Sequence, residues 1–212
     1  MISLKHKFIF IDIPKTASTS LRTALYDETC KYVHSCLLND TVTDFVQYNA
    51  MNRNGSVVDP KEINLNEYFV FTVVRNPFDR LVSYYRWRIR KYGKPGGGRE
   101  FSLNPDITFD EYVQNIEIYD DKKVIDHSRW WKPQIDWILY NDGSVCTDYI
   151  GRFESLSESW NHIKKQINID GDLQHLMKND NPVWYRDFYN SHTKQLVRER
   201  YKRDLDFFNY DF

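Results

Sequence analysis

The sequence predicts an α/β fold of three layers around a central, mostly parallel sheet. Two short runs of β-branched and aromatic residues, at 8–13 and 68–74, are apolar almost throughout, which is typical of strands buried on both faces of a parallel sheet. Each run is followed by a short turn and then by apolar residues at helical spacing. The same strand, turn and helix plan therefore occurs twice.

Length and composition indicate one domain over residues 1–212. The chain of 212 residues is 41% hydrophobic and 16% aromatic, which is enough for a sizeable core. Its formal net charge of -1 gives no field for wrapping nucleic acid or coating an anionic membrane, so we expect neither partner. The longest apolar stretch, 8–13, is far shorter than the ~20 residues that span a bilayer, and we expect a soluble protein without a membrane span.

The cysteines indicate a reducing compartment. The chain has three of them, Cys30, Cys36 and Cys146, which cannot all pair within one chain, and none forms a CxxC pair or a Cys/His metal spacing. We therefore expect reduced thiols, a cytoplasmic location and no metal requirement. The oligomeric state does not follow from the sequence.

The first predicted strand, 8–13, is ended by Pro14. Ser18 or Thr19 is the expected cap of a helix whose apolar positions include Leu21 and Leu25. The pattern then weakens over 29–66, with helical character at 41–51 and a loop at 52–56. The second strand, 68–74, leads through the turn 75–77 into a helix over 78–91.

The second half of the chain contains a glycine-rich loop and a helix with a clear start signal. Half of the eight glycines lie at 93–98, so residues 92–106 are expected to form a surface loop. Thr108 and Glu111 have the spacing of a capping box, which predicts a helix over 108–116. The aromatic segment 130–139 is too apolar to be solvated.

Three more elements complete the prediction. Residues 147–153 are expected to form a strand. A helix follows whose buried face consists of Leu156, Trp160, Ile163 and Ile167. One last helix is expected over 193–207, because Val197, Tyr201 and Leu205 recur every four residues.

The turn after the first strand is suited to an anion. Its cation is Lys15, and its hydroxyls belong to Thr16, Ser18, Thr19 and Ser20. The N–H groups and the positive dipole end of the following helix add to the attraction, so this P-loop-like strand, turn and helix is expected to bind phosphate. The alternative is a capped helix beside a solvated lysine. The segment 14–21 contains no glycine, which excludes a Walker A loop and argues against an ATPase.

The turn after the second strand offers a second anion site. Arg75 stands at the strand end and Ser83 lies about two helical turns further on. Ligands of open α/β sheets bind beyond the carboxyl ends of the strands, so the two turns together predict one ligand with two anionic groups. Residues 75–99 carry eight basic side chains against a single acidic one. Of these we expect Arg88, Arg90 and Lys91 to lie on a solvated helix face.

Two segments carry a family resemblance. FIFIDIPKTASTSL, at 8–21, and VFTVVRNPFDRLVSYY, at 70–85, resemble the 5′-phosphosulfate and 3′-phosphate binding segments of sulfotransferases that use 3′-phosphoadenosine 5′-phosphosulfate (PAPS). DYIGRFESL, at 148–156, and YKRDLDFFNY, at 201–210, resemble the carbohydrate, Golgi-type branch. The chain resembles a soluble, prokaryotic- or viral-like member of that branch, without the membrane anchor of eukaryotic Golgi members. The likeness is weakest over 29–66 and 92–128.

The resemblance implies an enzyme that moves a sulfuryl group from PAPS to a hydroxyl of a carbohydrate or glycoconjugate. It also assigns the residues of the cofactor site. Those implied for the 5′-phosphosulfate are Lys15, Thr16, Ala17, Ser18, Thr19 and Ser20. Those implied for the 3′-phosphate are Arg75 and Ser83, with Arg152 as a further contact. The sequence departs from the family at Ala17 and Ser18, where relatives often have a glycine pair or Ala-Gly.

The transfer requires a charge that stabilises the leaving phosphate oxygen and a base for the acceptor hydroxyl. Lys15 is expected to supply the charge. His34 is our choice of base, because relatives often place a basic histidine in that region. His127 is the alternative, since it precedes Trp130 and Trp131, and an aspartate or glutamate stays open as well. The sugar-stacking candidates, which core packing would equally explain, are Trp130, Trp131, Trp137, Tyr84 and Tyr85.

Two other functions stay open on the sequence. One is an atypical small-molecule or nucleotide kinase with a non-Walker phosphate loop. The other is a nucleotide-binding module that lacks catalysis.

Overall fold

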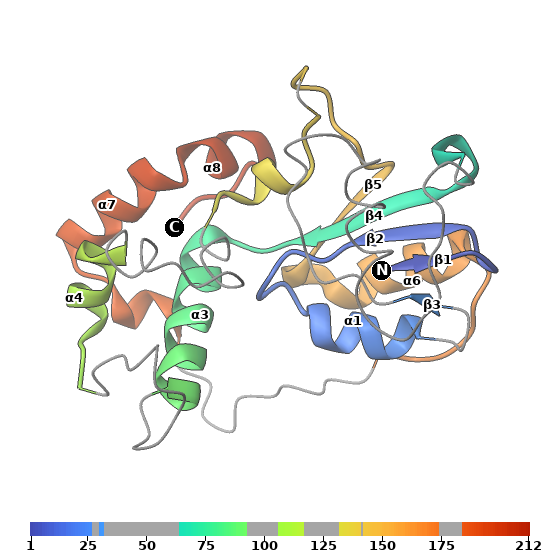
Figure 1. Cartoon of the computed structure of the whole chain (residues 1–212). Coiled ribbons are helices and arrows are strands. Elements are labelled where there is room, and N and C mark those ends of the chain that lie inside the picture. The colour runs from blue at the N-terminus through green and yellow to red at the C-terminus, as the bar shows by residue number, and fades with distance from the viewer. Residues whose placement is uncertain (27–29, 32–63, 93–105, 117–131, 141, 174–183) are drawn as a thin grey trace. The chain divides into compact units, whose positions relative to one another are not determined.

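A computed structural model of the chain describes residues 1–26, 30–31, 64–92, 106–116, 132–140, 142–173 and 184–212 (Figure 1). Several predictions lie outside the described residues. They are the helix at 41–51, the loop at 52–56, nearly all of the glycine-rich loop, and the residues His34, Cys36, His127, Trp130 and Trp131.

The chain divides into two compact units, and each is built from two stretches of sequence. Unit 1 consists of Met1–Arg75 and Gln134–Lys178, and unit 2 of Asn76–Pro133 and Asn179–Phe212. A single domain over 1–212 stays a prediction.

The described residues of unit 1 form a five-stranded sheet in the order β3-β1-β2-β4-β5. Its strands are β1 (Ile2–Ser3), β2 (Phe8–Ile11), β3 (Cys30–Lys31), β4 (Phe69–Val74) and β5 (Tyr149–Arg152). β4 runs parallel to β2 and to β5, whereas β1 is antiparallel to β2 and β3. The predicted α/β class with a mostly parallel sheet is thereby confirmed. Sequence reasoning missed β1 and β3, because two residues are too few to form a pattern.

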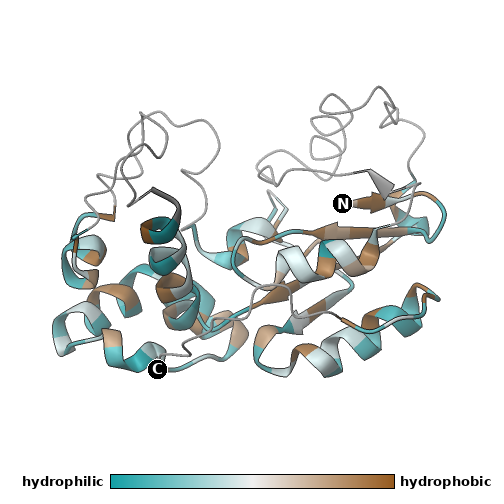
Figure 2. Ribbon diagram, turned by 90° about the horizontal axis from the view of Figure 1, so that it is seen from below, coloured by the Kyte–Doolittle hydropathy of each residue, from teal (hydrophilic) through white to brown (hydrophobic). Residues whose placement is uncertain are grey.

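Two helices cover one face of this sheet, α1 (Ser18–Leu25) and α6 (Leu156–Gln166) (Figure 1). Phe10 and Phe71 stack on that face with ring centroids 5.3 Å apart. Ile9 and Val70, whose side chains alternate to the opposite face, are buried as well. The strands therefore have apolar residues on both sides, and Figure 2 colours them brown. The predicted buried face of α6, from Leu156 to Ile167, is confirmed.

Short 3₁₀ helices connect these elements of unit 1. They are η2 (Leu65–Glu67), η3 (Gln134–Trp137) and η4 (Phe153–Ser155).

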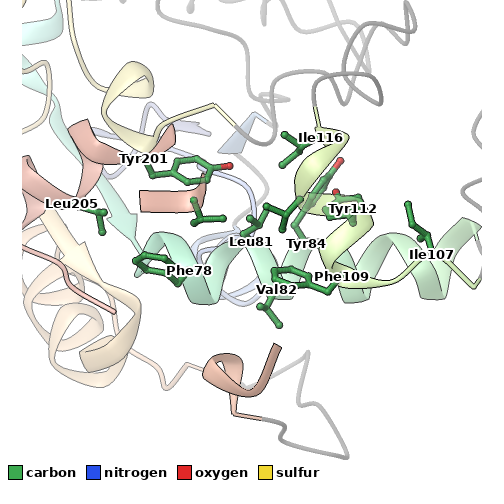
Figure 3. Packing of buried hydrophobic residues seen from close by; sticks show 12 residues of the cluster. Phe78, Leu81, Val82, Tyr84, Ile107, Phe109, Tyr112, Ile116, Tyr201 and Leu205 are labelled. Carbon is green, nitrogen blue, oxygen red and sulfur yellow. The ribbon is translucent and has the colours of Figure 1, made fainter. Parts of the chain in front are cut away.

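Unit 2 is helical. Its elements are α3 (Pro77–Tyr92), α4 (Phe109–Gln114), η5 (Tyr185–Phe188), α7 (Ser191–Arg200) and α8 (Lys202–Phe208). Figure 3 shows their shared core, in which Phe78 and Leu81 of α3 lie in one cluster with Tyr112 of α4, Tyr201 and Leu205. The capping box is confirmed: Thr108 Oγ1 accepts from Glu111 N, and Glu111 Oε2 accepts from Thr108 N. The Glu111 carboxylate accepts from both Thr108 N and Thr108 Oγ1, and these two hydrogen bonds lower the pKa of Glu111.

Two expectations about unit 2 are wrong. The single helix over 193–207 is two helices, because Tyr201 leaves helical geometry at φ -103° and ψ 22°. Its ring is nevertheless buried with Val197 and Leu205, so the apolar spacing continues across the break. Arg88 is not solvated but buried, with its guanidinium 5.9 Å from the Tyr84 ring centroid. Arg90 is exposed, as expected.

The described aromatic candidates for sugar stacking belong to the core. Trp137 and Tyr84 are 2% exposed. Tyr85 is half-buried against Phe109 and Tyr112, and its hydroxyl donates to Ile107 O at 2.7 Å. For these three residues packing explains the aromatic character.

Gly151 lets β5 approach α6 closely. A Cβ at this position would lie 2.9 Å from Ser159 Cβ and 3.2 Å from Val73 Cγ2. We predict that Gly151→Ala lowers the free energy of unfolding by about 1 to 3 kcal/mol, because the added methyl overpacks a closed contact. Urea denaturation measures the change. Ser157→Ala, at an exposed position of α6, is the control and should stay within about 0.5 kcal/mol of the wild type. An unchanged midpoint for Gly151→Ala would contradict this packing.

Candidate functional site

The carboxyl ends of three parallel strands lie at one edge of the sheet in unit 1. Ile11 of β2 pairs with Thr72 of β4, and Val74 of β4 pairs with Arg152 of β5. The turn that contains Lys15 follows β2, and Arg75 directly follows β4. Three of the predicted basic site residues are thus brought to the same edge.

The turn after β2 has an alternating backbone. Lys15 has φ 72° and Ala17 has φ 70°, whereas Thr16 between them keeps a negative φ. Thr16 is fully buried, and its Oγ1 donates to Ile13 O at 2.8 Å, which closes the turn. Such alternation directs successive N–H groups into one concavity that attracts anions. Positive φ is costly for residues with a Cβ, so two non-glycine residues here mark a backbone held against strain.

Helix α1 starts without a side-chain cap. Its N-cap is Ala17, and no side chain accepts a hydrogen bond there. The expectation that Ser18 or Thr19 is the cap is wrong, because both lie inside the helix; Ser18 is half-buried and Thr19 is exposed. The first bond of α1 runs from Leu21 N to Ala17 O at 3.1 Å. The N–H groups of Ser18 and Thr19 therefore have no carbonyl partner within the helix, and the positive dipole end points to the turn.

An ion pair offsets the acidic residue next to this turn. Asp12 is buried immediately after β2, and its Oδ2 lies 3.1 Å from Arg22 Nη1 of α1. Because the carboxylate is paired with a guanidinium, it repels an anion in the turn less than an unpaired carboxylate would.

Arg75 joins the two predicted turns. Its Nη1 donates to Lys15 O at 3.1 Å, so the residue after β4 contacts the turn after β2 directly. The guanidinium also lies 3.9 Å from the ring centroid of Phe153, in cation–π geometry. Lys15 and Arg75 are both half-buried, as expected at the rim of a site.

Gln134 holds the main chain of Arg75. Its Oε1 accepts from Arg75 N at 2.9 Å, and its Nε2 donates to Arg75 O at 2.8 Å. Gln134 is fully buried at the start of η3. Sequence reasoning missed both Gln134 and Phe153. The only signals were indirect, since Gln134 lies in the aromatic segment 130–139 and Phe153 in the family-like segment 148–156.

Arg152 is fixed through its main chain. Its N–H donates to Ser159 Oγ at 2.9 Å, and Ser159 Oγ donates to Arg152 O at 3.2 Å. Ser159 is buried on α6, so this helix sets the end of β5. The side chain of Arg152 is half-buried, next to Val74 in the strand register.

The other predicted cofactor residue, Ser83, belongs to unit 2, where it is half-buried on α3. The start of α3 is set by Asn76, whose Oδ1 accepts from Phe78 N at 3.0 Å. Asn76 Nδ2 in turn donates to Asp211 O at 2.7 Å. The ligand contact of Ser83 stays a prediction.

The predicted bases His34 and His127 lie outside the described residues. Within the described part of the chain, no group of three or more His, Cys, Asp or Glu side chains is arranged to hold a metal ion. No described helix is both long and apolar enough to cross a membrane. Cys146 is a free, buried thiol, and burial raises its pKa to about 12. It is therefore no nucleophile at neutral pH.

Comparison with known proteins identifies relatives of the chain. The model of the sulfotransferase family matches residues 1–211. Carbohydrate sulfotransferase 14 from Danio rerio is 26% identical over 206 residues, which cover 88% of this chain and 52% of the relative. Carbohydrate sulfotransferase 11 from Rattus norvegicus is 22% identical over 232 residues, covering 97% and 65%. Carbohydrate sulfotransferase 10 from Homo sapiens is 24% identical over 185 residues, covering 78% and 51%.

The chain spans about half of the length of carbohydrate sulfotransferases 14 and 10. No solved structure gives a significant match.

The strain in the turn after β2 can be tested by alanine-to-glycine substitutions, through their effect on the free energy of unfolding. We expect Ala17→Gly to leave the free energy of unfolding unchanged or to raise it by up to about 1 kcal/mol, because glycine removes the Cβ clash at positive φ. Ala24→Gly, inside α1, should lower it by about 1 kcal/mol. Thermal denaturation of the two variants measures the difference. Equal losses would show that Ala17 is not strained.

Proposed function

The chain belongs to the sulfotransferase family, and from this premise we propose that it moves a sulfuryl group from PAPS to a hydroxyl of a carbohydrate or glycoconjugate. The family model matches residues 1–211, and the relatives that cover most of the chain are named carbohydrate sulfotransferases. We infer the acceptor class from those names and not from the described residues.

One observation carries the proposal: Arg75 Nη1 donates to Lys15 O. PAPS has anionic groups at both its 5′ and its 3′ position, so its site needs two anion-binding turns that lie close together. The hydrogen bond supports such a pair. The residues of the turn suit the 5′ end, because the alternating backbone at Lys15 and Ala17 and the open first turn of α1 offer N–H donors to a phosphate.

The proposed roles follow the family resemblance residue by residue. We assign the 5′-phosphosulfate to the turn residues Lys15, Thr16 and Ala17 and to the first residues of α1, Ser18, Thr19 and Ser20. We assign the 3′-phosphate to Arg75 and Ser83, with Arg152 as a further contact. An arginine fork can donate two parallel hydrogen bonds to a phosphate, which favours Arg75 for this role.

In the proposed transfer, the bond from sulfur to the bridging phosphate oxygen breaks and a bond from sulfur to the acceptor oxygen forms. The ammonium of Lys15 neutralises the charge that develops on the leaving oxygen. The N–H groups of the turn hold the phosphate in place, so the acceptor can approach in line. The hydroxyl proton goes to a base, for which we propose His34, with His127 as the alternative.

The setting of the reaction is also a proposal. PAPS is the only co-substrate that we propose, and no metal is required for the roles given above. We propose the cytoplasm as the location, which the odd number of cysteines supports, because three cysteines cannot all pair within one chain. We propose no nucleic-acid partner, because the net charge of -1 gives no field for one.

Binding of the product nucleotide tests the two-turn site. Adenosine 3′,5′-bisphosphate should raise the melting temperature more than 5′-AMP or 3′-AMP at equal concentration, because only the bisphosphate reaches both turns. At one hundred times its dissociation constant, a ligand stabilises the folded state by about 2.7 kcal/mol. Differential scanning fluorimetry measures the three shifts. Equal shifts for all three nucleotides would refute the assignment.

Transfer itself is tested with radiolabelled PAPS and a panel of glycans. We predict that Lys15→Ala lowers kcat at least about 100-fold, because the leaving oxygen loses its cation. Binding of adenosine 3′,5′-bisphosphate, measured by calorimetry, should weaken much less. Lys5→Ala, at an exposed residue before β2, is the matched control and should keep full activity. A fully active Lys15→Ala protein would exclude this role for the lysine.

A further inference from the structure

The side-chain amide of Gln134 forms a closed pair with the main chain of Arg75. One amide accepts the N–H of Arg75 at 2.9 Å and donates to its carbonyl at 2.8 Å. This is the two-bond pattern that a residue of a neighbouring strand makes in a sheet. Since β4 ends at Val74, Gln134 extends the main-chain pairing by one residue, to the residue that carries the proposed anion-binding side chain.

This pairing determines where the guanidinium of Arg75 can lie. With its N–H and carbonyl both hydrogen-bonded, the backbone of Arg75 is restrained, and the guanidinium moves mainly through side-chain torsions. Those torsions are limited by the contact with Lys15 O at 3.1 Å and by the Phe153 ring at 3.9 Å. A shift of the Arg75 backbone would therefore change the direction of the guanidinium and break its contact with the Lys15 turn.

The chemistry of the pair requires an amide. Gln134 is 0% exposed, so its partners on Arg75 have little access to water if the amide is lost. A leucine of similar size offers neither donor nor acceptor. A glutamate carboxylate can accept from the N–H but cannot donate to the carbonyl, whereas a protonated glutamic acid does both.

We propose that Gln134 is a positioning residue for nucleotide recognition: it orients Arg75 toward the 3′-phosphate and so determines the preference for 3′-phosphorylated over 3′-unphosphorylated nucleotides. The inference rests on the proposed function of the Arg75 turn. Gln134 contacts the main chain of Arg75 and acts on the nucleotide only through it.

The test measures the selectivity for the 3′-phosphate. Isothermal calorimetry gives the Kd values of 5′-AMP and adenosine 3′,5′-bisphosphate, and their ratio is the selectivity. Gln134→Leu should lower this ratio at least tenfold while changing the Kd of 5′-AMP less than threefold. Ile138→Ala, which opens a cavity at a buried side chain of the same segment, is the control. It should lose stability but keep the wild-type ratio.

Gln134→Glu allows the presence and absence of the donated hydrogen bond to be compared in a single folded variant, by changing the pH. An ordinary glutamate carboxyl is deprotonated at pH 8. Burial raises its pKa, so the variant gains its proton at a higher pH than an exposed glutamate would as the pH falls. We divide the selectivity of the variant for the 3′-phosphate by the selectivity of the wild type at the same pH. This quotient should be low at pH 8 and rise toward one at pH 5.5. This normalisation removes the protonation of the phosphates, which affects both proteins alike. Circular dichroism confirms that the variant is folded at both pH values.

The outcomes separate the two proposals. A wild-type ratio near one would overturn the proposed function and this inference with it. A wild-type preference that persists in Gln134→Leu, or a Gln134→Glu ratio that does not respond to pH, would overturn the role of Gln134 alone. A loss of selectivity in Ile138→Ala equal to that in Gln134→Leu would also overturn it, because reduced stability would then explain the effect.

Discussion

The hydrogen bond between the guanidinium of Arg75 and the carbonyl of Lys15 is the contact on which the site depends. It joins two turns that are far apart in sequence and adjacent at the edge of the sheet. The parallel register of β2 and β4 makes this possible, because it puts both strand ends at the same edge. Three features position this contact: the pairing of the strands, the hydrogen bonds from Gln134 to the main chain of Arg75, and the cation–π contact with Phe153. The sheet therefore matters here chiefly as the frame that aligns the two turns.

Much of the fold could be predicted because its central elements carry strong local signals. β2 and β4 are nearly continuous apolar runs, α6 has a regular apolar face, and the capping box of α4 is a spacing of two residue types. Other features lack such signals. β1 and β3 are too short to show a period. The break at Tyr201 escaped notice because its ring stays in the same core as Val197 and Leu205, and the periodicity is thus preserved.

The site residues that directly follow a strand could be predicted from the sequence. Those that reach the site only through tertiary contacts could not. Lys15 and Arg75 follow directly from the two strand ends. Gln134 becomes significant only when η3 brings it to the end of β4, and no local pattern marks a glutamine for that task. The start of α1 shows a further limit: several hydroxyl residues suggested a capped helix, but the N-cap is Ala17. Arg88 shows the same limit in unit 2, since Tyr84 and the core beside it bury a charge that composition assigns to solvent.

The positive φ angles of Lys15 and Ala17 also bear on the thermodynamics of ligand capture. A glycine-rich phosphate loop samples many conformations and loses that entropy when it closes on an anion. Residues with a Cβ have only a narrow basin at positive φ, so this loop has fewer alternatives to give up. Part of the conformational entropy is thus lost during folding rather than on anion binding, so the turn that contains Lys15 and Ala17 is pre-organised. The strain in this turn lowers the stability of the fold, whereas its rigidity does not lower the affinity for the anion.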